Sequence, residues 1–159
     1  MVSMQQVQKT KVILPPAPAS ANTDVIAGKL NDFGPATVEP ISGSSWEPLW
    51  DQWVHQHHYL GYRRLLGHRL KYFAFLKDRP VAALSWSAPA LKLAVRDRLI
   101  GWSPSKRKRH QHQLAANSRF LILPWVRIPN LASHVLALNI ARLPTDWLSH
   151  FNHRLLLLE

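Results

Sequence analysis

Cysteine is absent from the 159 residues of this chain, which excludes disulfide bonds, cysteine-ligated zinc and a thiol nucleophile. Acidic residues are scarce as well, with nine aspartates and glutamates against 20 lysines and arginines. With so few carboxylates, we can assemble neither a Ser-His-Asp triad nor the Asp-Asp-Glu centre of transposases. The sequence also contains no Walker phosphate-binding loop. We therefore assign no residue as a catalytic base or nucleophile.

Long apolar runs are also missing. No stretch approaches the roughly 18 apolar residues that a membrane helix needs. Residues Met1 to Gln8 lack the charged start and apolar core of a secretory signal. We expect a cytoplasmic protein, which agrees with the lack of cysteine.

Hydrophobic residues make up 47% of the chain, a proportion that suits one globular domain. The net charge of +11 is distributed unevenly. Residues 1–60 carry −2, whereas residues 61–159 contain 17 basic and four acidic residues, or +13. A body this basic predicts a polyanionic partner such as nucleic acid, a coenzyme or a phosphorylated surface.

The composition changes near residue 44. Residues 1–44 are typical of an extended, Pro/Ala-rich N-terminal segment, most clearly at Leu14–Thr23. We expect an edge strand at Ala36–Ile41, because Pro40 is excluded from a central strand. Residues 45–159 are expected to form the main domain.

The main domain opens with a helical pattern. Ser44 and Ser45 are expected to cap a helix, whose apolar residues then follow helical spacing: Trp46, Leu49, Trp50, Trp53 and Val54. Three tryptophans on one face indicate a core-facing helix, with a base-stacking platform as the alternative.

Strand and helix patterns then alternate. Leu70–Leu76 and Val81–Ser87 flank a short polar segment, which predicts a β-hairpin. Ala90–Ile100 is expected to form a short helix, and Ser103–Gln113 a basic loop or helix start. Near the end, Thr145 is expected to cap a last short helix and Leu155–Leu158 to form a buried strand.

The segment from Phe120 to Leu138 combines a strand, a turn and a helix. Phe120–Pro124 predicts a buried strand, and Asn130 is followed by apolar residues at helical spacing. The unpaired N–H groups of a helix N-terminus attract phosphates. The sequence therefore predicts an anion site here, with an ordinary strand–turn–helix and a solvated Arg127 as the alternative.

This turn resembles the Arg/Gln-x-x-Gly-x-Gly/Ala turn of the GCN5-related acyltransferases, which holds the pyrophosphate of acyl-coenzyme A. Arg127 matches the first position and Ala132 the last, while Asn130 occupies the Gly position and Pro129 removes one donor. The resemblance implies acyl-coenzyme A as the cofactor, bound by Arg127, Asn130, Ala132 and Ser133.

Three separated blocks resemble the DruA-type proteins of Druantia anti-phage systems, a family often found beside transposases. The blocks are His57–Gly61, Ile100–Ser103 and Ser118–Pro124, the last followed by Pro129–Ser133. The resemblance implies phage-defence or mobile-element biology, with protein partners from such a system. Because that family continues further, it also implies a C-terminally truncated chain.

The densest basic run is Lys106, Arg107, Lys108 and Arg109. Clustered cations bind phosphates without sequence preference, so we expect nucleic-acid contact, with a solvated basic loop as the alternative. Arg63, Arg64, Arg69 and Lys71 would extend this surface. The nine histidines suggest no metal site, because no acidic cluster accompanies them.

These patterns together predict an α/β (α+β) protein with a mixed, acyltransferase-like sheet and flanking helices, incomplete at its C-terminus. It would act on or near nucleic acid and derive from an acyl-coenzyme A-dependent transferase. A non-enzymatic basic binding module is the alternative.

Overall fold

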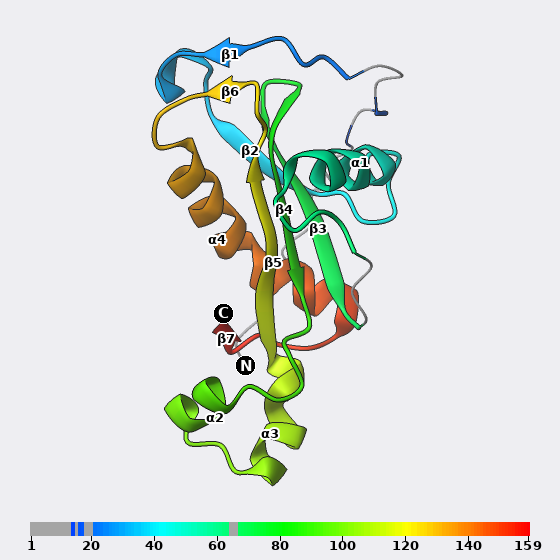
Figure 1. Cartoon of the computed structure of the whole chain (residues 1–159), viewed down its shortest axis with the longest axis vertical. Helices are drawn as coiled ribbons and strands as arrows, with labels where there is room; N and C mark the ends of the chain where they lie inside the picture. Colours follow the sequence, from blue (N-terminus) through cyan, green and yellow to red (C-terminus); the bar gives the residue numbers. More distant parts are fainter. Residues whose placement is uncertain (1–13, 15, 18–20, 64–66) are drawn as a thin grey trace, which may run out of the picture.

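The computed structural model describes residues 14, 16–17, 21–63 and 67–159, and its main feature is a five-stranded sheet (Figure 1). The strand order is β2-β3-β4-β5-β7, antiparallel throughout except for the parallel pair β5–β7. The strands are β2 (Ala36–Pro40), β3 (Arg69–Leu76), β4 (Arg79–Ser87), β5 (Leu114–Ile122) and β7 (Leu157–Leu158). The predicted α/β class is confirmed.

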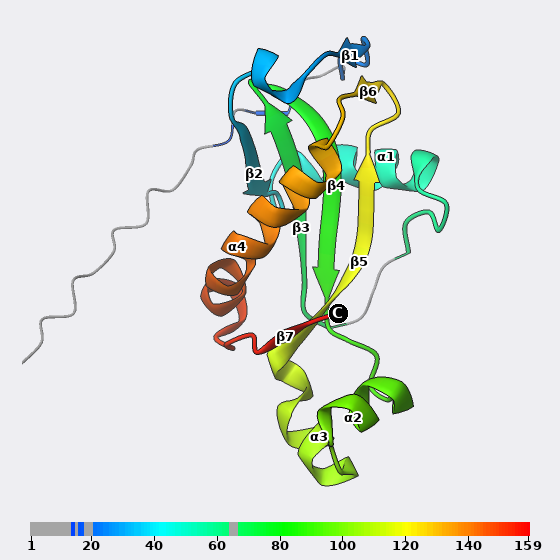
Figure 2. The same ribbon diagram turned by 90° about the vertical axis from the view of Figure 1, so that its left-hand side faces the viewer.

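Two helices cover opposite faces of this sheet, α1 (Glu47–His57) and α4 (Leu131–Phe151), as Figure 2 shows. The alternation of side chains along β3 assigns the faces. Lys71 reaches α1, whereas its neighbour Tyr72 donates a hydrogen bond to Asp146 of α4 at 3.1 Å. With both faces covered, β3 is buried almost throughout, which explains its near-continuous apolar sequence.

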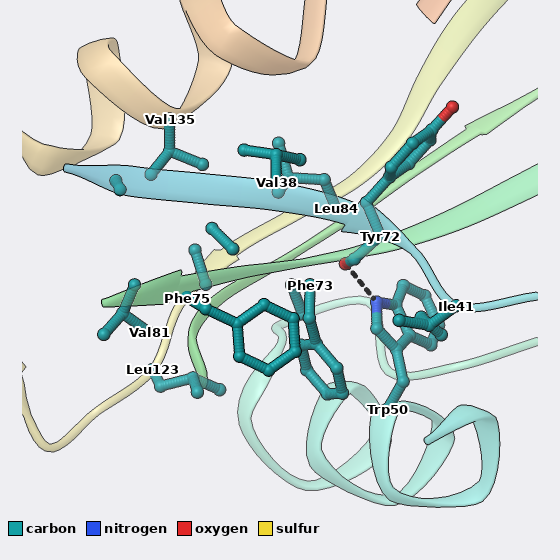
Figure 3. Close-up of a cluster of buried hydrophobic side chains, with 14 of the residues drawn as sticks. Val38, Ile41, Trp50, Tyr72, Phe73, Phe75, Val81, Leu84, Leu123 and Val135 are labelled. Carbon is teal, nitrogen blue, oxygen red and sulfur yellow. Dashed lines mark hydrogen bonds between the residues drawn. The ribbon is translucent and has the colours of Figure 1, made fainter. Parts of the chain in front are cut away.

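Aromatic side chains from α1 and β3 form the centre of the core on the α1 side (Figure 3). Trp50 is fully buried, and its indole Nε1 donates to the Tyr72 carbonyl at 3.1 Å. Trp53 packs edge-on against Phe73 with ring centroids 5.7 Å apart. The tryptophan face of α1 is therefore a core face, as predicted, and not a base-stacking platform.

A small parallel ribbon lies beyond one end of the sheet, and a helical extension lies at the other (Figures 1 and 2). The ribbon pairs β1 (Ile26–Ala27) with β6 (Val126–Arg127), beside the 3-10 turn η1 (Leu30–Asp32). The extension connects β4 to β5 and contains α2 (Ala94–Ile100), α3 (Pro104–His110) and the 3-10 turn η2 (Gln111–Gln113).

Several predicted elements are confirmed. The strand at Ala36–Pro40 lies at the sheet edge, and β3 and β4 form the hairpin. The expected short helix at Ala90–Ile100 starts later, at Ala94, and the basic segment after Ser103 is helical. Of the proposed N-terminal segment, residues 1–13, 15 and 18–20 lie outside the described residues, as does Arg64.

The predicted last helix capped by Thr145 is wrong. Helix α4 runs without a break from Leu131 to Phe151 and contains Pro144 in its interior. Leu143 and Trp147, on either side of that proline, are at most 1% exposed. Their burial against the sheet keeps the helix continuous despite the backbone hydrogen bond that Pro144 cannot form.

Two strand predictions also need correction. Strand β5 begins at Leu114, six residues before the predicted Phe120, and its residues 116–122 are half-buried instead of buried. The predicted strand at Leu155–Leu158 is only two residues long, and Leu157 is 40% exposed. An apolar run predicts that a segment is a strand, but it does not tell whether that strand lies in the centre of the sheet or at its edge.

Candidate nucleic-acid interface and anion-binding turn

The basic run forms helix α3 in the extension beyond the foot of the sheet (Figure 1). Ser103 is its N-cap, and the Ser103 hydroxyl accepts a hydrogen bond from the Lys106 backbone N–H at 3.3 Å. Pro104 occupies the first helical position, where its missing N–H costs nothing. Lys106, Lys108 and Arg109 are all exposed on this helix.

Arg107 differs from its three neighbours because it is half-buried and paired. Its Nη1 lies 2.9 Å from Oδ2 of Asp97 on α2. Burial raises the pKa of Asp97, but hydrogen bonds from Arg107 and Arg96 outweigh it and hold that pKa below its usual value. Asp97 stays ionised near neutral pH, and the ion pair joins α3 to α2.

Arg96 connects the extension to the rest of the molecule. This residue is 5% exposed, and it donates to Asp97, to the Ala90 carbonyl at 3.1 Å and to Glu159 Oε1 at 3.2 Å. The backbone of Glu159 in turn bonds both Ala115 and Asn117 of β5. The two carboxylates near α3 are thus engaged by Arg96 and Arg107, which leaves the charges of Lys106, Lys108 and Arg109 facing solvent.

The predicted anion turn lies at the opposite end of the sheet, after β6 (Figure 1). Arg127, Asn130 and Ser133 are exposed and Ala132 is half-buried. Asn130 adopts the left-handed conformation, with φ of 63°, which glycine and asparagine tolerate best. It precedes α4 and makes no side-chain capping bond. The Leu131 N–H donates to the Ile128 carbonyl at 3.4 Å, so the Asn130 side chain leaves the N–H groups of Ala132 and Ser133 to solvent or to a ligand.

A partner strand fixes the position of this turn. Ile26 of β1 donates its N–H to the Trp125 carbonyl at 2.9 Å, and Gly28 donates to the Arg127 carbonyl at 3.4 Å. Ile128 and Leu131 are buried on either side of Pro129 and Asn130. The four predicted cofactor residues are brought together at the N-terminus of α4, and α3 lies far from them (Figure 2).

A third polar cluster, which the sequence analysis did not assign, surrounds Lys71 on the α1 face. The Lys71 side chain is 2% exposed, and its Nζ contacts Glu47 Oε1 at 2.7 Å, Asp51 Oδ1 and the Tyr62 hydroxyl at 3.1 Å. Burial lowers the pKa of Lys71, but these bonds outweigh it and raise that pKa above its usual value. The available sequence signal was a lysine within the apolar and aromatic run Leu70–Leu76.

Beside this cluster lies a crevice of about 10 Å³, room for about one water molecule. Two of its lining residues are serines, whose Ser85 Oγ and Ser118 Oγ lie 2.8 Å apart. It is lined by Trp50, Tyr62, Arg63, Arg69, Lys71, Ser85, Ser118 and Arg119. Arg63, Arg69 and Lys71 thus gather on the sheet face and do not extend the surface of α3.

Two of the nine histidines, His55 and His57, lie in the last turn of α1. Over residues 14, 16–17, 21–63 and 67–159, no group of three or more histidines and carboxylates is arranged to hold a metal ion. In the same part of the chain, no helix combines the length and apolar character needed to cross a bilayer.

Fold and site together define a mixed α/β protein with a basic helical extension. A separate turn, in which Asn130 adopts a left-handed conformation typical of glycine, precedes its longest helix. The chain belongs to the family described as Druantia protein DruA, whose model matches residues 8–159. This family gives the chain a defence-system context. No curated protein and no solved structure matches it.

Proposed function

We propose that this DruA-family protein binds nucleic acid in the cytoplasm through helix α3, without sequence preference and as part of a defence system. The observation that carries the proposal is the pairing of Arg107 with Asp97, which fixes the helix so that Lys106, Lys108 and Arg109 face solvent. Cations held on one rigid element bind a phosphate backbone at lower entropic cost than cations on a free loop.

The test replaces Lys106, Lys108 and Arg109 together by alanine and measures the affinity for a DNA duplex by fluorescence anisotropy at several salt concentrations. We expect weaker binding and a slope of log affinity against log salt that is shallower by about 2–3, since each phosphate contact contributes about 0.9.

A matched pair of single variants provides the control. Lys108→Ala should weaken binding and Lys29→Ala should not, although both lysines are exposed. An unchanged salt slope in the triple variant would show that α3 is only a solvated basic surface.

A second function, binding of acyl-coenzyme A at the α4 turn, is favoured by the left-handed conformation of Asn130. This is the conformation that the acyltransferase motif obtains from glycine. The outer edge of β5 also supports it. In the described chain, β7 and Glu159 pair with β5 only as far as Asn117, so no strand pairs with residues 118–122 on that side. Arg127, Asn130, Ala132 and Ser133 would hold the pyrophosphate.

Calorimetric titration with coenzyme A tests this second function. Asn130→Gly should retain binding and Asn130→Pro should abolish it, because proline cannot adopt a positive φ. Arg127→Ala should weaken binding about tenfold, the value of one charge-assisted hydrogen bond. Absence of binding by the unmodified protein at millimolar coenzyme A would leave α3 as the functional surface.

A further inference from the structure

A cavity of about 210 Å³ opens at the foot of the sheet, next to the basic helix. Gln111 and His112, on its wall, belong to η2 and follow directly after the last residue of α3. The remaining walls come from the segments just before β3 and just after β4, from the first residue of β5 and from α4. The described residues that line it are Gly67, His68, Ala88, Pro89, Leu91, Gln111, His112, Leu114 and Trp147.

Two imidazoles, those of His68 and His112, line this cavity, and the ring of His153 contacts both of them. The ring of His153 lies 4.8 Å from that of His112 and 5.3 Å from that of His68, centroid to centroid. His68 also stacks on Phe151, with centroids 4.2 Å apart and planes only 9° apart. The arrangement is one of aromatic rings in contact, and in the described chain it is not a metal-binding geometry.

The chemistry of the lining favours a neutral, planar ligand. Burial lowers the pKa of His68, and the neighbouring His153 and His112 lower it further, so its ring is neutral at physiological pH. A neutral imidazole and the Gln111 amide each offer a donor and an acceptor. Among the described residues, no lysine, arginine or carboxylate lines the cavity, and this lining favours a neutral ligand over an anion or a cation.

Trp147 of α4 also lines the cavity. It is 1% exposed, and its indole Nε1 has no hydrogen-bond partner among the described residues. That nitrogen is itself buried, so the hydrogen-bonding groups that line the cavity are those of His68, His112 and Gln111. A ligand with an aromatic face and hydrogen-bonding groups at its edge would suit this wall. At about 210 Å³ the cavity is smaller than the roughly 300–1,000 Å³ of drug-sized sites, and it suits a single ring system.

We propose that this cavity receives one unstacked base of the nucleic acid whose backbone is bound by α3. The inference rests on the proposed nucleic-acid binding and adds that single-stranded or locally opened nucleic acid is the preferred form. Base capture of this kind is how proteins read unpaired nucleotides, by stacking on aromatic rings and hydrogen bonding to base edges. The chain continuity of α3 and η2 places the backbone contact and the base contact side by side.

The test compares two single-stranded 12-nucleotide DNAs of equal charge, one with ordinary bases and one with abasic tetrahydrofuran units throughout. We expect the protein to bind the first about fivefold to a hundredfold more tightly, the contribution of one stacked base. His112→Ala and Gln111→Ala should bring the ratio close to one and leave the affinity for the abasic strand unchanged. His55→Ala, which removes an exposed histidine of α1, is the matched control and should keep the ratio.

Equal affinity for the two strands, or a ratio that His112→Ala does not change, would overturn base capture while leaving backbone binding by α3 intact. If neither strand binds, the proposed function itself fails, and the cavity is then tested alone. Adenosine and uridine at millimolar concentration should shift the imidazole NMR signals of His68 and His112. Unchanged signals would overturn the inference.

Discussion

Lys71 is a charged residue within a buried strand, and the fold accommodates its charge only because the side chain has partners. Glu47 and Asp51 supply two carboxylates, and the rings of Trp50 and Tyr62 lie 5.0 and 4.5 Å from its Nζ. A buried ammonium without such partners would be strongly destabilising, so the four groups act as one unit.

Lys71→Met should lower the free energy of unfolding by about 3 kcal/mol, because two carboxylates then face each other without a cation. The carboxylates are 27% and 33% exposed, which places the loss at the lower end of the range for buried pairs. Urea denaturation at neutral pH measures it, with Lys92→Met on the surface as the control.

The same variant has an expected pH dependence. Burial raises the pKa of Glu47, but the bonds from Lys71 and Gly43 outweigh it and lower that pKa below 4.5. A lowered carboxyl pKa stabilises the fold above the unfolded value, and this stability is lost as pH falls through the folded value. The difference in free energy of unfolding between Lys71→Met and the unmodified protein should therefore shrink below pH 4.5. A difference that stays constant with pH would contradict the ion-pair explanation.

At the scale of elements, α4 shows how tertiary packing overrides a local stop signal. Arg142 fixes it to the sheet edge, with ion pairs to Glu39 at 3.0 Å and Asp146 at 2.7 Å and a hydrogen bond to the Val38 carbonyl. These contacts and the burial of Leu143 and Trp147 lie on both sides of Pro144. The helix continues because ending it would expose this whole face.

Pro144→Ala should stabilise the protein by about 1–3 kcal/mol, since an interior proline costs about 3 kcal/mol relative to alanine. The expected increase in Tm is roughly 2–4 °C for each kcal/mol in a chain of this size. Thr145→Ala is the informative comparison. In a continuous helix it should be neutral or slightly stabilising, whereas a loss of about 1 kcal/mol would mean that Thr145 is an N-cap after all.

At the scale of the whole molecule, His68 joins the start of β3 to the end of α4 and to the cavity beside α3. The titratable groups that face it are His153, after α4, and His112, in η2. Its lowered pKa means that the unfolded chain binds a proton more readily than the folded one. The contribution of neutral His68 to the free energy of unfolding is therefore fully present above about pH 6.5, and it is lost as pH falls through the folded pKa.

The free energy of unfolding, measured by urea denaturation between pH 7.5 and 5, should show this decline. The carboxylates titrate below this pH range. His58 contributes with the same sign, because burial and then Arg119 lower its pKa. The decline should thus become shallower, without disappearing, in His68→Asn. A variant that keeps the full slope would show that His68 is accessible to protons in the folded protein.

Local sequence was sufficient for the elements whose pattern and packing agree. The hairpin of β3 and β4 follows from two β-prone runs around a polar turn, and α1 follows from the 3.6-residue spacing of its tryptophans. The order of strand and helix patterns also indicated the α/β class, and the composition indicated the basic character of residues 61–159. The exposed turn at Asn130 was predictable for the same reason, since a single residue type determines its backbone conformation.

Only the tertiary structure decided which residues meet across the chain. It paired Arg107 with Asp97, so that one member of the basic run supports the helix and the others face solvent. It also brought together His68, His112 and His153, which are separated by 44 and 41 positions in the sequence. Periodicity reports which side of an element is apolar, but partners distant in sequence depend on strand order and register, which arise when the whole core packs.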